Sequence, residues 1–188
     1  TITSDMADVY FDETLFPGER ITLSFECETE NSIDTLEYVI QMGGANRFAP
    51  SRADDYGYRM FDNFDLSYSK APVYEWMELD VGLGGDGNFI NISDNWEEED
   101  ESRTISLPFP VTYYGNTYSS ITVCSNGWAA FGNQSVVNFH NRAIPSPIGP
   151  PAMLAPFWDD LAAGLGTMFY KHDADTDIFV IEWSRVSN

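Results

Sequence analysis

The chain has 188 residues, of which 30 are acidic and 9 are basic, and its formal net charge at pH 7 is −21. Hydrophobic residues make up 43% and aromatic residues 15% of the chain, a content that excludes a disordered acidic tail. So negative a surface repels nucleic-acid phosphates and anionic lipid headgroups, and no apolar run approaches the ~20 residues of a membrane-spanning helix. We therefore expect neither nucleic-acid binding nor membrane insertion.

The first segment predicts a small β unit. Residues 21–28 alternate strictly between apolar and polar side chains, which is typical of a strand with one buried and one wet face. A polar turn at 30–34 leads into a second alternating run, marked by Leu36, Tyr38 and Ile40. Residues 43–55 lack periodicity and indicate a linker. We therefore divide the chain into an N-terminal strand unit, residues 1–48, and a larger unit, residues 49–188.

The next segment is rich in aromatic residues but never helical in period. Residues 56–80 indicate an ordered wrapping segment that packs aromatic rings on a sheet and ends in a short strand at 73–79. The glycines at 82–88 predict a turn, because neither a helix nor a lysine follows to form a phosphate loop. The acidic run at 94–101 predicts a solvated loop.

In the remainder of the chain, short apolar runs separated by turn residues predict a series of short strands. They are expected near residues 104–107, 109–114, 117–124, 127–131, 151–157, 165–171 and 177–184. This spacing favours an all-β fold, an antiparallel β-sandwich. Asn126-Gly127 is a strong hairpin dipeptide because both residues tolerate positive φ. Phe157 and Trp158 are the expected core anchors, since each aromatic ring buries on the order of 150–250 Å².

The aromatic motifs of this region carry a resemblance to a known family. The stretches LPFPVTYYGNTYSSITVCSNGWAAFG, IPSP, APFWDDL and FVIEW resemble the nidogen-type extracellular module in its bacterial form. That form is attached to modular secreted proteins, including gingipain-like and subtilisin-like peptidases. The motif positions are Asn126, Gly127, Trp128, Pro156, Phe157, Trp158 and Asp159. The resemblance implies a secreted, non-catalytic β-sandwich with an adhesive, spacer or structural role, or alternatively an accessory portion of a secreted peptidase.

Catalytic chemistry finds little support in these residues. Cys124 with His140 is the sole conceivable cysteine–histidine pair, but Cys124 lies in an apolar strand, where thiols are usually inert. Asp159 and Asp160 could supply the paired carboxylates of a glycoside hydrolase, but they are adjacent, and adjacent strand residues point to opposite faces. We therefore predict no enzyme in this chain. Cys27 and Cys124 fall in separate units, and we expect two free, buried thiols rather than a disulfide.

Binding sites are better candidates than active sites. Asp173, Asp175 and Asp177 alternate within one loop and supply the hard oxygens that calcium prefers, although the loop lacks the glycine and distal glutamate of an EF-hand. The competing interpretation is an ordinary hairpin turn, where Asp is common. Exposed tryptophans can stack on sugars, and Trp76, Trp96 and Trp128 are the candidates for a glycan partner. A cell-surface protein is the other expected kind of partner.

The last strand suggests that the sandwich is completed by additional chain. Residues 178–183 are apolar on both faces, with Phe179, Ile181 and Trp183 on one and Ile178 and Val180 on the other. Such a strand belongs inside a sheet, and an exposed edge of this kind invites association. We expect the chain to be part of a longer precursor. The completing strand comes from another segment of that precursor or from a neighbouring subunit, in which case an extracellular fibre results.

Overall fold

The computed structural model describes residues 8–11, 15–44, 47–94, 100–163 and 166–187, and it confirms the all-β prediction. The strands are β1 (Glu19–Glu28), β2 (Ile33–Met42), β3 (Asn88–Phe89), β4 (Ser102–Tyr113), β5 (Asn116–Cys124), β6 (Trp128–Phe131), β7 (Met153–Leu154), β8 (Met168–Asp173) and β9 (Ile178–Trp183). The one helical element in these ranges is a 3-10 turn, Val81–Leu83. No described helix is long and apolar enough to cross a membrane.

The chain folds as two compact units that divide between Glu75 and Trp76. The sequence placed its boundary at 48/49, where composition changes, whereas the contacts extend the first unit through the aromatic segment. That segment packs on Phe16, which is buried and meets the rings of Phe61 and Tyr68 edge-on. The predicted strand at 73–79 is wrong: these residues form no strand.

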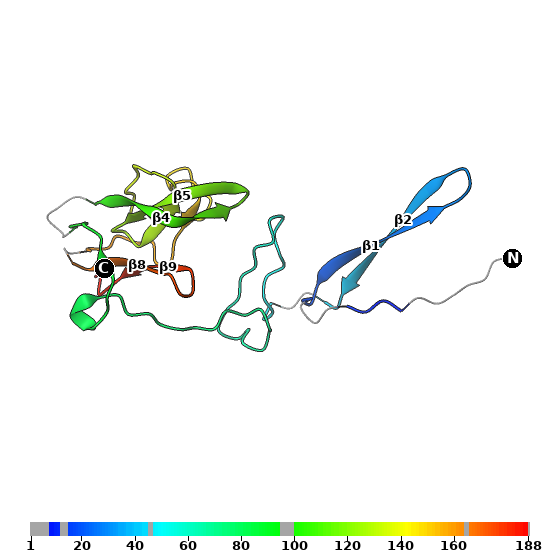
Figure 1. Ribbon diagram of the computed structural model, residues 1–188, viewed down its shortest axis with the longest axis horizontal. Coiled ribbons are helices and arrows are strands. Elements are labelled where there is room, and N and C mark those ends of the chain that lie inside the picture. Colours follow the sequence, from blue (N-terminus) through cyan, green and yellow to red (C-terminus); the bar gives the residue numbers. More distant parts are fainter. Residues whose placement is uncertain (1–7, 12–14, 45–46, 95–99, 164–165, 188) are drawn as a thin grey trace. The chain divides into compact units, whose positions relative to one another are not determined.

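The first unit contains a two-stranded antiparallel ribbon of β1 and β2 (Figure 1). Both predicted strands are confirmed, but the expected buried face is wrong. Phe25 and its cross-strand partner Leu36 share one face, and Leu36 is 65% exposed. Cys27 is exposed as well. Both cysteines are free, as predicted, but only Cys124 is buried. The physical reason is that, among the described residues of the first unit, no second layer covers the apolar side of the ribbon.

The second unit is a sandwich of two antiparallel sheets (Figure 1). One has the strand order β4-β5-β6-β7 and the other β3-β8-β9. The two strands predicted at 104–107 and 109–114 are one strand, β4, in which the pairing with β5 shifts between Ser106 and Val111. A bulge of this kind bends a strand without ending it, so the two halves read as separate in the sequence.

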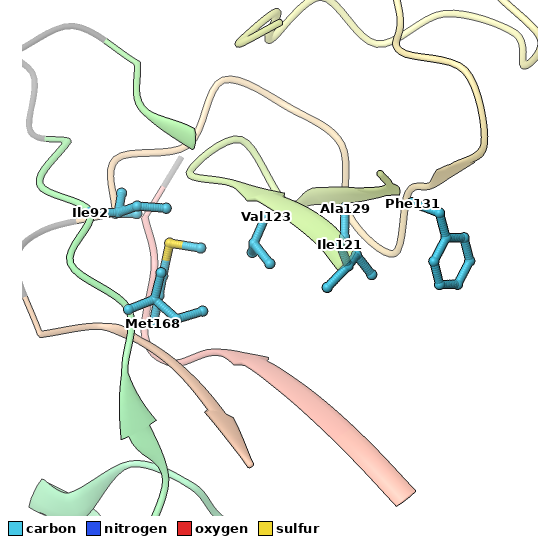
Figure 2. Close-up of a cluster of buried hydrophobic side chains, with 8 residues drawn as sticks. Ile92, Ile121, Val123, Ala129, Phe131 and Met168 are labelled. Atoms are coloured by element: carbon cyan, nitrogen blue, oxygen red, sulfur yellow. The ribbon is translucent and has the colours of Figure 1, made fainter. Parts of the chain in front are cut away.

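Apolar side chains from both sheets fill the space between them. Figure 2 shows part of this cluster, with Ile121, Val123, Ala129 and Phe131 from β5 and β6, Met168 from β8, and Ile92 from the loop after β3. Strict alternation along β5 places Ile121 and Val123 on the inner face. Burial of such side chains stabilises a fold by about 1.5–3 kcal/mol each.

Buried acids tie the start of this unit to the end of β9. Asp80 is buried and accepts hydrogen bonds from the Ser184 hydroxyl at 2.6 Å and the Gly82 amide at 2.7 Å, and it pairs with Arg185. The Ser184 hydroxyl is the main cause that holds the pKa of Asp80 below its usual value. Glu182 is also buried and accepts from the Leu79 amide at 2.6 Å. These bonds fix β9, an edge strand of its sheet, in place.

Candidate functional site

The dipeptide Asn126-Gly127 forms the predicted turn between β5 and β6. The expected reason, a positive φ at both residues, holds for Gly127 but not for Asn126. Gly127 has φ +70°, whereas Asn126 has no positive φ. The Asn126 side chain is fully buried: its amide donates to the Val137 carbonyl at 3.0 Å, and its oxygen accepts from the Leu161 amide at 3.0 Å. Asn126 therefore joins three segments of the chain, a role that its place in a turn did not predict.

Gly127 is required for a second reason, which is space. A Cβ atom at this position would lie 1.9 Å from the Phe157 carbonyl oxygen. The Phe157 amide also donates to the Gly127 carbonyl at 3.2 Å. The two sequence motifs SNGW and APFWDDL thus meet backbone to backbone, and their joint presence in the sequence reflects this contact.

The aromatic pair of the second motif divides between core and surface. Trp158 is 6% exposed and is a core anchor as predicted, but Phe157 is 62% exposed, so its assignment as a core anchor is wrong. Pro156 and Phe157 lie in a turn, where neighbouring side chains point different ways. At Phe157 the fold uses the backbone rather than the ring. Asp159 follows, and its Oδ1 accepts from the Asp160 amide.

A single carbonyl receives both motif tryptophans. The indole N–H groups of Trp128 and Trp158 donate to the Asn138 carbonyl oxygen at 3.1 and 2.8 Å. Asn141 donates in turn to the Trp158 carbonyl at 3.0 Å. Trp128 is fully buried, so it is not available to stack on a glycan. Of the other candidates, Trp76 is exposed and Trp96 lies outside the described residues.

The motif junction comprises SNGW, APFWDDL and the loop at 137–141, and the cysteine that packs against its two tryptophans is not a reactive nucleophile. Cys124 is fully buried, and burial raises the pKa of its thiol to about 12. A thiol with so high a pKa carries almost no thiolate at neutral pH, and the thiolate is the reactive form. His140 is exposed. The junction is a structural clamp.

The loop of Asp173, Asp175 and Asp177 is a hairpin turn between β8 and β9. Asp173 accepts from the Asp175 amide at 3.1 Å and from the Thr176 hydroxyl at 2.6 Å, and the hydroxyl is the main cause that lowers the pKa of Asp173. Asp177 pairs with His172 at 3.2 Å. Among the residues described, no three His, Cys, Asp or Glu side chains are grouped to hold a metal. The Asp173 carboxylate therefore stabilises the turn.

Asp94 is a residue that sequence reasoning missed. It begins the acidic run that predicted a solvated loop, yet it is 5% exposed, and burial raises its pKa. Its amide donates to the Ala163 carbonyl at 3.0 Å, while its Oδ2 atom is buried without a hydrogen-bond partner in the described structure. Residues 95–99 of the run lie outside the described ranges. No local signal separates Asp94 from the acids that follow it.

An apolar cleft lies between β9 and the inner face of the four-stranded sheet. It encloses about 280 Å³ and is lined by apolar side chains from β4, β5, β6, β7 and the turn after β7. From β9 it receives Phe179, Ile181 and Trp183, the face that the sequence alternation predicted. In the described sheet, β9 pairs with β8 on one side and with no strand on the other. The cleft and this edge adjoin.

One family model, described as NIDO related, matches residues 80–188. This range covers more than half of the chain and nearly all of the second unit. It includes the motif junction, the Asp loop and the apolar cleft. No curated protein and no solved structure matches the chain.

Replacing Gly127 by alanine is expected to destabilise the second unit strongly. Alanine at positive φ costs about 1–2 kcal/mol, and contact with the Phe157 carbonyl adds roughly 1–3 kcal/mol. The matched control is Gly132→Ala, where φ is +86° but the nearest atom lies 3.6 Å from the new Cβ. Urea unfolding measures both variants. Equal losses of unfolding free energy would contradict the role of the close approach.

Asp94→Asn is expected to stabilise the chain at pH 7 by about 1 kcal/mol, because it removes a buried charge. The raised pKa of Asp94 means that the native protein binds its proton more tightly than the unfolded chain, so wild-type stability from this group grows as pH falls. The advantage of the variant should therefore shrink toward pH 4. Asp55→Asn, at an exposed site, controls for the change in net charge. A pH-independent difference would refute the assignment.

Proposed function

Because this chain belongs to the NIDO-related family, we propose that it is a non-catalytic module of a modular secreted bacterial protein, with an adhesive, spacer or structural role. Two observations support a non-catalytic role: the one buried thiol is held protonated, and the family motifs form a structural clamp. The net charge of −21 keeps the chain soluble and attracts cations, which is consistent with an extracellular location.

A single observation carries the structural role: the apolar cleft beside the open edge of β9. An added strand would hydrogen-bond to the free edge of β9, and every second side chain would enter the cleft. Its apolar residues would replace solvent against Phe179, Ile181 and Trp183. We therefore propose that the module is completed by strand addition.

The origin of this strand separates the alternatives. A strand from the next subunit makes the chain part of an extracellular fibre if the rotation between successive subunits does not close the assembly into a ring. A strand from elsewhere in the precursor makes it a spacer or adhesive module, or an accessory portion of a secreted peptidase. The reading frame around this segment distinguishes the last two, since a peptidase domain would be encoded beside it.

Sedimentation of the purified chain tests strand addition between subunits. We expect concentration-dependent association, and we expect Leu154→Lys to prevent it by placing an ammonium group in the cleft. Ile178→Lys is the matched control, because Ile178 is exposed on β9 but does not line the cleft.

Amide exchange across β9 completes that test. A monomer whose β9 amides exchange quickly would place the donor strand elsewhere in the precursor. A stable monomer with slowly exchanging amides from Ile178 to Trp183 would refute strand addition altogether, because the sandwich would then be closed without help.

Calcium binding by Asp173, Asp175 and Asp177 is a separate proposal, supported by three hard carboxylates within one hairpin loop. A cation bound only to the native state raises the melting temperature. Calcium should therefore raise Tm relative to EDTA at low salt, and Asp175→Asn should abolish the difference. Identical melting curves would leave these residues with their turn role alone.

A further inference from the structure

Two acidic segments of the chain meet at the turn between β5 and β6. Ser125, in this turn, donates its amide to the Glu101 carbonyl at 2.9 Å, and its hydroxyl accepts from the Glu101 amide at 3.3 Å. The neighbouring Asn126 accepts from the Leu161 amide at 3.0 Å. These bonds bring the acids just before β4 and the two aspartates of the APFWDDL motif to one side of the sandwich.

Asp94 comes from a third segment, the loop after β3, and lies against the same place. Its amide donates to the Ala163 carbonyl at 3.0 Å, just beyond the APFWDDL motif. Asp94 is 5% exposed, and its Oδ2 atom is buried with no hydrogen-bond partner among the described residues. A carboxylate oxygen in this position is costly to bury, and in native structures such atoms have partners.

The charged groups around Asp94 are acids. Burial is the main cause that raises the pKa of Asp94, and repulsion from Asp100 and Asp160 raises it further, as does Glu101. Arg103 pairs with Glu101 at 3.2 Å, and no lysine or arginine in the described ranges pairs with Asp94. A buried carboxylate in such surroundings is stabilised either by a proton or by a cation.

The chemistry of these groups selects a hard cation. The donors at this place are carboxylate, hydroxyl and carbonyl oxygens, and the nearby soft ligand, the Cys124 thiol, is held protonated by a pKa of about 12. No three described carboxylates already meet at one point, so water and neutral oxygens must supply most of the roughly six to eight ligands that calcium takes. Magnesium tolerates so irregular a shell less well, because it demands near-ideal octahedral geometry.

We propose that Asp94 anchors a calcium ion that binds between Asp100 and Asp160, beside the turn of β5 and β6. The ion neutralises the repulsion among these acids and joins the loop after β3, the residues before β4 and the APFWDDL motif. With few charged ligands the site is weak, with a Kd of about 10⁻⁴–10⁻³ M, the range of extracellular calcium modules. It is separate from the loop that contains Asp175, so either calcium proposal can fail alone.

Calcium titration of the full chain carrying Asp175→Asn tests the site, because this background removes the ligand proposed in the loop between β8 and β9. Calorimetry should show saturable binding. Asp160→Asn alters an exposed side chain and should weaken binding about tenfold through the loss of one charge. Asp55→Asn, also exposed, changes the net charge equally and should bind calcium as its parent does.

Asp94→Asn in the same background separates a calcium ligand from a merely buried acid. In EDTA the variant should be more stable than its parent, because it lacks the buried charge. In about 10 mM calcium, at least roughly ten times the Kd, bound ion should raise the parent's Tm by about 5 °C and leave the variant's unchanged. The variant therefore loses its advantage in calcium, which a damaged fold cannot explain.

Several results would overturn the proposal. Asp94→Asn could keep the same advantage in EDTA and in calcium, which would mean that Asp94 is held by a proton alone. Unchanged affinity in Asp160→Asn, or no saturable binding at about 10 mM calcium, would remove the site. An equal rise in Tm with magnesium at matched ionic strength would replace a calcium site by general screening of negative charge.

Discussion

The rest of the sandwich depends on the two hydrogen bonds of the buried Asn126 side chain. An amide group in the core must have its hydrogen bonds made, and Asn126 finds its partners on two segments that are distant in the sequence. One segment is the loop at 137–141, whose Asn138 carbonyl accepts hydrogen bonds from both motif tryptophans. The other segment directly follows Trp158. A residue that bonds in both directions fixes the register of three segments at once, which apolar packing alone does not do.

Gly127 makes that arrangement possible by admitting a neighbouring backbone where a side chain would stand. The Phe157 carbonyl approaches its Cα, and the chain then turns so that Trp158 enters the core. β7 is only two residues long, so strand pairing contributes little in this region. The fold is held there by side-chain bonds to carbonyls and by two large indoles.

Apolar surface is exposed at two places in the structure, and both bear on the proposed adhesive or structural role. The ribbon of β1 and β2 exposes an apolar face, and β9 carries an open edge beside an apolar cleft. Exposed edges and patches usually mark interaction sites. A net charge of −21 opposes indiscriminate association between copies, so contacts at these margins depend on shape and on backbone pairing.

The sequence by itself determined the elements whose signal is local. Alternation located β1 and β2, the spacing of apolar runs between turn residues located β5 and β9, and Asn-Gly located the hairpin between β5 and β6. It also predicted Trp158 as a core anchor and Phe179, Ile181 and Trp183 as one face. Only the tertiary structure decided which of these faces lose water. Leu36 and Cys27 stay exposed because no second layer of the described first unit covers the ribbon, and Phe157 points outward. Asp94 is buried, although its local sequence looks like that of the acids that follow it. Burial depends on what lies across from a residue, and the residue's own neighbours in sequence do not encode it.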